Sequence, residues 1–327
     1  MGSCSRADSE VDVRRSIAIT CKQMQNHLPR HRERLEAAGF DLVVPTLSGQ
    51  QFNTAELIDI AHECVGIIAG DDDLGRATLT GLPNLKVLVR WGIGTDTVDF
   101  DAARALGVVV RNTPGVFGDE VADSAFGYIL NLARGHHLID AAVRRGEWKK
   151  IEGVSLSGET LGVVGAGSIG TAVVRRGLGF GMSVVVHDPF VQSGLPEGAV
   201  LVGLDELLTR SRFVVLTAPS TDSTRGMINA ASLRKFRADA FLVNVARGDL
   251  VVESDLADAL RKGALAGAGL DVFDVEPLPV DSPLRSLNVV LGAHNGSNAT
   301  AGVMRASQRA VDILLEELER VESGSHR

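Results

Sequence analysis

Residues 161–170 read LGVVGAGSIG, an apolar run that leads into a glycine-rich turn, and residues 171–180 continue with the helical pattern TAVVRRGLGF. This is a GxGxxG signature placed between a strand and a helix. The first glycine permits the tight turn, the second lets a pyrophosphate approach the backbone, and the third lets the helix pack on the sheet. The amides at the helix N-terminus attract phosphate. The segment therefore predicts a dinucleotide-binding βαβ unit.

An acidic residue strengthens this prediction. Asp188 ends the strand-like run SVVVHD, 18 residues after Gly170. A carboxylate in this position can accept hydrogen bonds from the adenosine ribose hydroxyls. It would repel a 2′-phosphate, and Pro189 and Phe190 supply no cation. NAD is therefore the expected cofactor, in preference to NADP.

Further apolar runs follow the glycine turn at regular intervals, and an amphipathic helix is expected over residues 300–321. Together with the first run they predict six strands: LGVVG, SVVVHD, FVVLT, AFLVNV, GAGLDV and NVVLG. Six strands fit a dinucleotide-binding sheet.

A separate α/β pattern precedes this region, from Ser16 to about Asn112. Short apolar runs such as IAIT alternate there with amphipathic stretches such as HLPRHRERLEAAGF, which favours a parallel sheet covered on both faces. Residues 113–115, TPG, break the pattern, and a helix is expected over 118–134. Its apolar face holds Val121, Ala125, Tyr128, Ile129 and Leu132. The sequence thus predicts two doubly wound parallel-sheet α/β domains, 1–112 completed by 296–327, and 113–295.

Composition narrows the classes of function. The 327 residues include 41 acidic and 33 basic ones, a net charge of −8, and 4% aromatic residues, which argues against nucleic-acid binding. No apolar run reaches the ~18 residues that span a bilayer, and the polar N-terminus lacks a signal-peptide core. Cys4, Cys21 and Cys64 show no CxxC spacing, so reduced thiols and a cytoplasmic location are expected. The eight histidines show no metal-binding spacing, so no metal is expected.

Three polar residues follow strands of the second region: Arg247 after AFLVNVA, Glu276 after GLDVFDV and His294 after NVVLGA. Each alone is compatible with a turn ion pair, a solvated loop acid or a loop histidine. In an open parallel sheet, however, ligands bind outside the carboxyl ends of the strands. We therefore expect the three side chains to converge at one catalytic site.

Several segments, in order and spacing, resemble the D-specific 2-hydroxyacid dehydrogenases. They are LGVVGAGSIG with the later VHD, LRKFRADAFLVNVARGDLVVE, GAGLDVFDVEP and LGAHNGS. The resemblance covers nearly the whole chain. It implies a Rossmann NAD-binding domain inserted into a flavodoxin-like substrate-binding domain, and an NAD-dependent oxidoreductase that transfers a hydride between nicotinamide and a D-2-hydroxyacid/2-oxo acid pair. Two segments, RWGIGTDTVD and LGAHNGSNA, resemble most closely the phosphoglycerate dehydrogenase-like branch of this family. That branch adds acids that bear a phosphate or phosphonate as candidate substrates.

The resemblance also implies roles for individual residues. Arg247 would orient the substrate carboxylate, His294 would be the acid/base and Glu276 would be its partner and favour the imidazolium. The segment RWGIGTDTVD resembles the family's substrate loop, with Arg90, Trp91, Gly92, Ile93 and Gly94 as substrate-binding residues. The cofactor-binding residues would be Gly165, Gly167, Ser168, Ile169, Gly170, Asp188, Pro189, Ala218, Pro219, Val245, Ala246, Asp271, His294 and Gly296.

Other functions are compatible with the same three polar residues. A phosphite-type dehydrogenase would keep the same three polar residues, and so would a non-catalytic NAD(H)-sensing protein similar to the family's corepressors. A formate dehydrogenase is disfavoured because it resembles this pattern with glutamine in place of Glu276.

Gly118 and Asp123 stand where the family more often has asparagine and glutamate. The 118–134 helix resembles a dimerisation segment, which predicts a homodimer, although its apolar face could equally be internal core.

Overall fold

The structure is a computed structural model that describes residues 15–47, 49 and 51–324. Residue contacts divide the chain into unit 1, Met1–Thr113 with Met304–Arg327, and unit 2, Pro114–Val303. The boundaries predicted from the sequence were 112/113 and 295/296. Cys4 lies outside the described residues.

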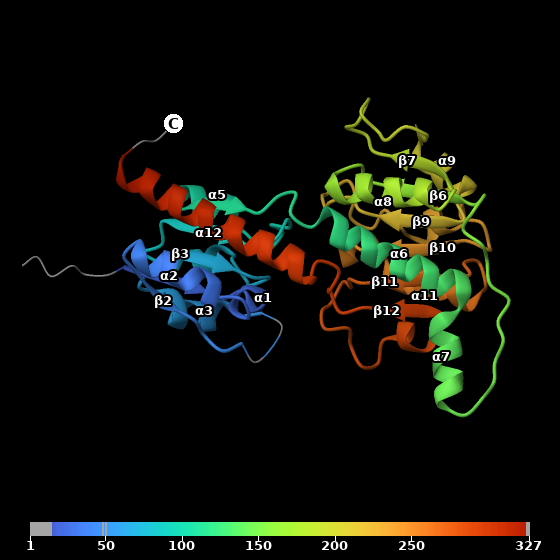
Figure 1. The fold of residues 1–327 in the computed structure, drawn as a ribbon, viewed down its shortest axis with the longest axis horizontal. Coiled ribbons are helices and arrows are strands. Elements are labelled where there is room, and N and C mark those ends of the chain that lie inside the picture. Colours follow the sequence, from blue (N-terminus) through green and yellow to red (C-terminus); the bar gives the residue numbers. More distant parts are fainter. Residues whose placement is uncertain (1–14, 48, 50, 325–327) are drawn as a thin grey trace, which may run out of the picture. The chain divides into compact units, whose positions relative to one another are not determined.

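Unit 1 is built on one parallel sheet (Figure 1), in the order β2-β1-β3-β4-β5. The strands are β1 Arg15–Ile19, β2 Phe40–Val43, β3 Cys64–Ala69, β4 Val87–Arg90 and β5 Val109–Asn112. This doubly wound order reverses between β1 and β3, as in flavodoxin-like folds. The predicted fold of this region is confirmed.

Helices cover the sheet of unit 1 because its strands are apolar on both faces. They are α1 Lys22–Gln25, α2 Pro29–Ala37, α3 Thr54–Ala61, α4 Arg76–Thr80, α5 Phe100–Ala105 and, from Met304 onward, α12 Thr300–Glu322. The last helix packs closely on β3, since a Cβ atom at Gly66 would lie 3.0 Å from Leu314. The helix predicted over 300–321 is therefore present.

Unit 2 contains a seven-stranded parallel sheet in the order β12-β11-β10-β9-β6-β7-β8. The strands are β6 Thr160–Val164, β7 Ser183–His187, β8 Ala199–Leu201, β9 Phe213–Leu216, β10 Phe241–Asn244, β11 Gly267–Leu270 and β12 Val289–Leu291. The six predicted strands are present, but the count of six was wrong. The seventh, β8, is a three-residue edge strand whose Val200 and Leu201 are exposed, so it lacks the apolar run that marks a buried strand.

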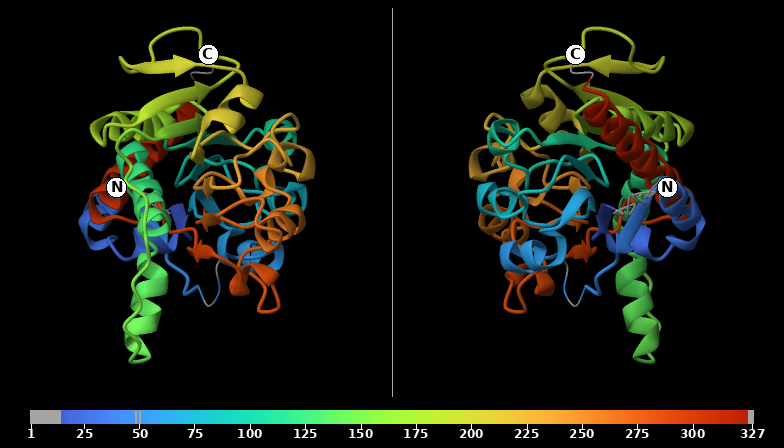
Figure 2. Two further views of the ribbon diagram at one scale, coloured as in Figure 1. Left: turned by 90° about the vertical axis from the view of Figure 1, so that its right-hand side faces the viewer. Right: turned by 90° about the vertical axis from the view of Figure 1, so that its left-hand side faces the viewer.

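Helices precede and connect the strands of unit 2. They are α6 Gly118–Arg134, α7 His136–Arg144, α8 Ser168–Gly179, α9 Leu204–Arg210, α10 Ala230–Leu233 and α11 Glu253–Arg261, with 3₁₀ turns at Gly248–Leu250 and Pro283–Ser286. Figure 2 shows α7 projecting from the body of this unit. The order of strands places the reversal between β6 and β9, where dinucleotides bind in this kind of sheet.

The helix α6 has the predicted bounds, and its apolar face packs inside unit 2. Val121, Ala125, Ile129 and Leu132 are buried, whereas Tyr128 is partly buried. The stripe is therefore internal core, the second of the two interpretations that its pattern allowed.

The two departures from the family pattern on α6 both meet α8. A Cβ atom at Gly118 would lie 3.2 Å from the Ser168 carbonyl oxygen, so glycine permits the close approach. Asp123 accepts a hydrogen bond from Arg176 at 2.7 Å, and Arg176 also binds Asp119. Glycine at position 118 and aspartate at position 123 therefore fit the packing of α6 against the first and the last turn of α8.

Candidate active site

The glycine turn of unit 2 has the geometry of a dinucleotide cradle. Gly165 has a φ of 98°, and a Cβ atom there would lie 2.7 Å from the Ala218 amide nitrogen. A Cβ at Gly170 would lie 1.9 Å from the Gly165 carbonyl oxygen, whereas a Cβ at Gly167 would meet nothing within 4 Å. At the first and third positions of the motif, any side chain larger than that of glycine would therefore clash with the backbone. The second faces open space, which fits a pyrophosphate close to the backbone.

The helix that follows this turn presents an uncapped end. Its N-cap residue is Gly167, which has no side chain to cap the first amides, and its first turn holds no acidic residue. Such amides and the helix dipole bind anions. The residues of this turn therefore fit the phosphates of a dinucleotide.

Asp188 is held against the same turn. Its two carboxylate oxygens accept hydrogen bonds from the Ala166 amide at 2.8 Å and the Phe190 amide at 2.9 Å. Each oxygen keeps further acceptor capacity, which ribose hydroxyls can use. Phe190 is 92% exposed, and neither it nor Pro189 places a cation beside the carboxylate.

The neighbouring strand completes the edge at which the strand order reverses. Thr217, directly after β9, donates its hydroxyl proton to the Gly165 carbonyl oxygen at 2.8 Å. The predicted cofactor contacts Ala218 and Pro219 follow it, and Ala218 adjoins the glycine turn. Val245 and Ala246 follow β10 in the same way, and the Val245 amide binds the Leu216 carbonyl oxygen at 3.4 Å.

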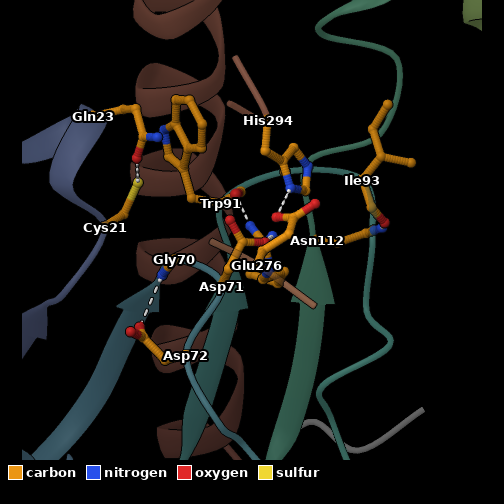
Figure 3. Close-up of polar contacts among 12 residues, drawn as sticks. Cys21, Gln23, Gly70, Asp71, Asp72, Trp91, Ile93, Asn112, Glu276 and His294 are labelled. Carbon is orange, nitrogen blue, oxygen red and sulfur yellow. Dashed lines mark hydrogen bonds and ion pairs between the residues drawn. The ribbon is translucent and has the colours of Figure 1, made fainter. Parts of the chain in front are cut away.

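Two of the three predicted catalytic side chains are in direct contact. His294 Nδ1 lies 2.8 Å from Glu276 Oε2, and the other carboxylate oxygen of Glu276 accepts the Phe273 amide at 2.9 Å. The two side chains are 27% and 22% exposed. Figure 3 shows the imidazole turned toward this carboxylate. The pair is thus fixed on one side while ligands can still reach the ring.

Arg247 lies on the turn next to this pair. Its guanidinium donates to the Ala246 carbonyl oxygen at 2.8 Å, and Asn244 binds the Arg247 carbonyl oxygen at 2.7 Å. A Cβ atom at the adjoining Gly248 would lie 1.9 Å from the carbonyl carbon of Phe273. The turn that carries Arg247 therefore packs directly on the loop that carries Glu276.

Asp271, predicted as a cofactor contact, organises the backbone around His294. It is 3% exposed, and its carboxylate accepts the Asn295 amide at 3.2 Å and the Gly296 amide at 2.8 Å. It also accepts the hydroxyl proton of Tyr128 at 2.9 Å. This role of Tyr128 was not predicted from the sequence. A signal was present, because Tyr128 is the single tyrosine of the sequence and puts a hydroxyl on an otherwise apolar face.

The predicted substrate loop in unit 1 begins at Arg90, the last residue of β4. Arg90 is buried, donates to the Trp91 carbonyl oxygen and forms an ion pair with Asp71. Gly92 has a φ of 135°, and a Cβ there would lie 2.7 Å from Arg90 Nη1. The loop is thus folded over its own arginine.

The other side chains of this loop differ in exposure. The Trp91 indole is 4% exposed and donates to the Ser307 hydroxyl at 3.1 Å, so it packs in the interior of unit 1. Ile93 is 37% exposed, and its carbonyl oxygen accepts a hydrogen bond from Asn112 at 2.7 Å (Figure 3). The function of this loop in substrate binding stays a prediction.

Within residues 15–47, 49 and 51–324, no group of three or more His, Cys, Asp and Glu side chains is arranged to hold a metal ion. Among the same residues, no helix combines the length and apolar character needed to cross a bilayer.

Comparison with known proteins agrees with the fold. The family model described as D-isomer specific 2-hydroxyacid dehydrogenase, NAD binding domain, matches residues 126–296. The glyoxylate reductase of Korarchaeum cryptofilum is 36% identical over 269 residues, 79% of this chain and 81% of that protein. The D-3-phosphoglycerate dehydrogenase of Methanocaldococcus jannaschii is 36% identical over 264 residues, 79% of this chain and 49% of that protein.

A solved structure extends the likeness to both units. The D-lactate dehydrogenase from Aquifex aeolicus, complexed with NAD and lactic acid, superposes with a TM-score of 0.82 at 26% identity and covers 94% of this chain and 98% of its own. The chain belongs to the family of D-isomer specific 2-hydroxyacid dehydrogenases. It is an NAD-dependent oxidoreductase that acts on a CH–OH group. The family, the fold class and the cofactor predicted from the sequence are confirmed.

Proposed function

We propose that the chain interconverts a small, unphosphorylated D-2-hydroxyacid and its 2-oxo acid, with His294 as the acid/base, Glu276 as its partner and Arg247 as the anchor for the substrate carboxylate. The contact between His294 Nδ1 and Glu276 at 2.8 Å supports this proposal most strongly. A carboxylate held against one ring nitrogen favours the imidazolium and fixes the orientation of the ring.

The geometry of the pair determines which atom transfers the proton. Because Nδ1 faces the carboxylate of Glu276 at 2.8 Å, Nε2 is the ring nitrogen that would face the substrate oxygen. NADH, held at the glycine turn and Asp188, would supply the hydride for the carbonyl carbon. His294 stabilises the developing alkoxide and protonates it, and in the reverse direction the neutral imidazole removes that proton.

Arg247 has the chemistry for orienting the substrate. Its planar guanidinium can bind a carboxylate through two parallel hydrogen bonds, which fixes the 2-oxo carbon more firmly than a lysine would. Its turn packs on the Glu276 loop through Gly248, so the anchor and the acid/base belong to one packed region. Orientation of this kind contributes a large part of the rate.

The proposed substrate lacks a phosphate or phosphonate because of the charges in unit 1. Arg90, the one cation in the predicted substrate loop, is already paired with Asp71. Asp72, which follows Asp71 after the end of β3, adds a further buried carboxyl group and no cation. Acids with a phosphate or phosphonate, which the sequence had added as candidates, are therefore the less favoured substrates.

The experiment is a panel of candidate substrates assayed at the nicotinamide absorbance band. It contains glyoxylate, hydroxypyruvate, pyruvate, their phosphooxy and phosphono analogues, and phosphite, each with NAD(H) and NADP(H). We expect turnover with an unphosphorylated 2-oxo acid and NADH, at a kcat/KM at least ~10-fold above that of the phosphorylated analogues. Binding of NADH without turnover of any acid would favour the sensor, and oxidation of phosphite would favour the phosphite-type enzyme.

The variant His294→Ala tests the assignment of the acid/base. We expect kcat to fall about 10²- to 10⁴-fold, while NADH binding, followed by its fluorescence, stays within a few-fold. His62→Ala is the matched control, because this side chain is 55% exposed and lies in unit 1. A kcat for His294→Ala close to that of the control would contradict the assignment.

We also propose that the chain forms a homodimer. The apolar face of α6 is buried in its own unit, so it supplies little surface for a partner. Exposed apolar side chains instead lie on and after α7, at Leu138, Val143 and Trp148. Sedimentation analysis should give the mass of two chains, and Trp148→Lys should weaken the dimer. A monomer at micromolar concentration would contradict this proposal.

A further inference from the structure

We propose that Tyr128 is a positioning residue for His294, which acts through the carboxylate of Asp271. This inference rests on the proposed function of His294. It concerns a helix that contributes no side chain to the predicted catalytic set, and it assigns to α6 a function beyond the packing of the core.

The ring of Tyr128 occupies a slot that two glycines open. A Cβ atom at Gly269, on β11, would lie 2.7 Å from the Cβ of Tyr128. A Cβ at Gly292, directly after β12, would lie 2.0 Å from the Tyr128 hydroxyl oxygen. Side chains at these two positions would exclude the ring. The glycines on adjacent strands therefore let the tyrosine reach across the sheet edge to Asp271.

The hydroxyl of Tyr128 completes the set of donors around one buried carboxylate. Asp271 Oδ1 accepts from the Tyr128 hydroxyl at 2.9 Å and from the Asn295 amide at 3.2 Å, and Oδ2 accepts from the Gly296 amide at 2.8 Å. A carboxylate that is 3% exposed is stable only when such donors compensate for the lost water. Tyr128 supplies the one side-chain donor of this set.

Asp271 in turn holds the backbone on both sides of the catalytic ring. The His294 amide donates to the Asp271 carbonyl oxygen at 2.7 Å, so three successive amides, at 294, 295 and 296, bind this single residue. His294 has a φ of 50°, the one positive φ of a non-glycine residue among the described residues. A left-handed backbone is unfavourable for such a residue unless its surroundings hold it. The bonds to Asp271 are the local restraint that does so.

A second contact from the same helix supports the assignment. Ser124 lies one turn before Tyr128 on α6, and its hydroxyl donates to the Gly296 carbonyl oxygen at 3.3 Å. Burial and the charge of Asp271 raise the pKa of Tyr128, so its hydroxyl remains protonated and donates across the pH range of the enzyme. The helix α6 thus supports the His294 loop with two hydroxyl groups spaced four residues apart, directly from Ser124 and through Asp271 from Tyr128.

The test is Tyr128→Phe, which removes the hydroxyl and leaves the ring in its slot. We expect kcat to fall about 10-fold because the imidazole is misplaced, while KM for the 2-oxo acid, set by Arg247, changes less than twofold. Phe126→Leu is the control for packing, because Phe126 is buried on the same helix and stacks on Phe180. Phe126→Leu should lower the melting temperature without a selective fall in kcat at nearly constant KM.

A second readout needs neither substrate nor cofactor. The NMR signal of the His294 ring, identified by its loss in His294→Gln, should change its pH titration in Tyr128→Phe and keep it in Phe126→Leu. If Tyr128→Phe does not fold, Ser124→Ala tests the same loop and should show the same two effects in weaker form. Unchanged kcat and an unchanged ring titration in the folded variant would overturn the proposal. Loss of turnover in His294→Ala is established first, so failure of the proposed function is recognised separately.

Discussion

The carboxyl edges of the two parallel sheets carry the same kinds of polar residues but use them differently. In unit 1, Asp72 is 1% exposed and accepts hydrogen bonds from Thr20, Phe52 and Gly70, and Arg90 is paired with Asp71. In unit 2, Glu276 and His294 contact each other and remain partly exposed. The difference teaches that a polar residue at a strand end indicates a site only when some of its hydrogen-bonding capacity remains open to a ligand.

The most damaging change to the unit 2 edge, after loss of His294 itself, is Glu276→Gln. We expect kcat to fall about 10²-fold, because the neutral amide no longer favours the imidazolium and leaves the ring less firmly oriented. Glu253→Gln is the matched control, since Glu253 accepts the Asp274 amide in the same loop at 2.9 Å without touching His294. Steady-state kinetics should separate the two variants by more than tenfold, and equal losses would show that the effect is only one of loop packing.

The glycine turn provides a paired comparison within unit 2. Gly170→Ala should destabilise the fold by about 1–3 kcal/mol, because its Cβ would lie 1.9 Å from a carbonyl oxygen. Gly167→Ala meets open space, so it should leave the melting temperature nearly unchanged and raise the Kd for NADH instead. Thermal denaturation and NADH fluorescence measure the two effects. Equal destabilisation by both variants would contradict the distinction.

In unit 1, Asp72→Ala should affect stability without changing kcat per folded molecule. It leaves three donors without their acceptor, which costs about 1–3 kcal/mol. Burial raises the pKa of Asp72 even though Thr20, Phe52 and Gly70 donate to it. A raised pKa of an acid means that its contribution is complete at low pH and decreases as pH rises through the folded-state pKa. Asp72→Ala should therefore cost more free energy of unfolding at pH 4 than at pH 7, and the opposite trend in urea titrations would contradict this account.

The smallest expected effect concerns the buried thiols of unit 1. Burial raises the pKa of Cys21 to about 12 and that of Cys64 to about 11, and both are 1% exposed. Thiolates are the reactive form. In a Cys4→Ser variant, we expect almost no reaction with a disulfide reagent at pH 8 in the native state and reaction of both thiols after denaturation. Rapid native labelling would show that unit 1 opens more readily than its packing indicates.

Much of this arrangement could be predicted from the sequence, because it depends on local patterns. Uninterrupted stretches of sequence contain the glycine turn, the helical spacing of apolar residues in α6 and the apolar strands before Arg247, Glu276 and His294. The edge strand β8 was missed because its three residues are largely exposed. The sequence marked Tyr128 as a hydroxyl on an apolar face, but it could not identify the partner Asp271, which lies 143 positions further along the chain. The reasons for Gly118 and Asp123 likewise became visible only with α8 packed against α6.

The pH dependence of kcat/KM, measured in both directions with the preferred substrate pair, tests the assignment of His294 most directly. Reduction requires the imidazolium and should decline as pH rises, whereas oxidation requires the neutral imidazole and should increase over the same interval. In His294→Ala, the residual rates of reduction and oxidation should no longer change in opposite directions with pH. Profiles of the same shape in both directions, or opposed profiles that persist in His294→Ala, would contradict proton transfer by His294.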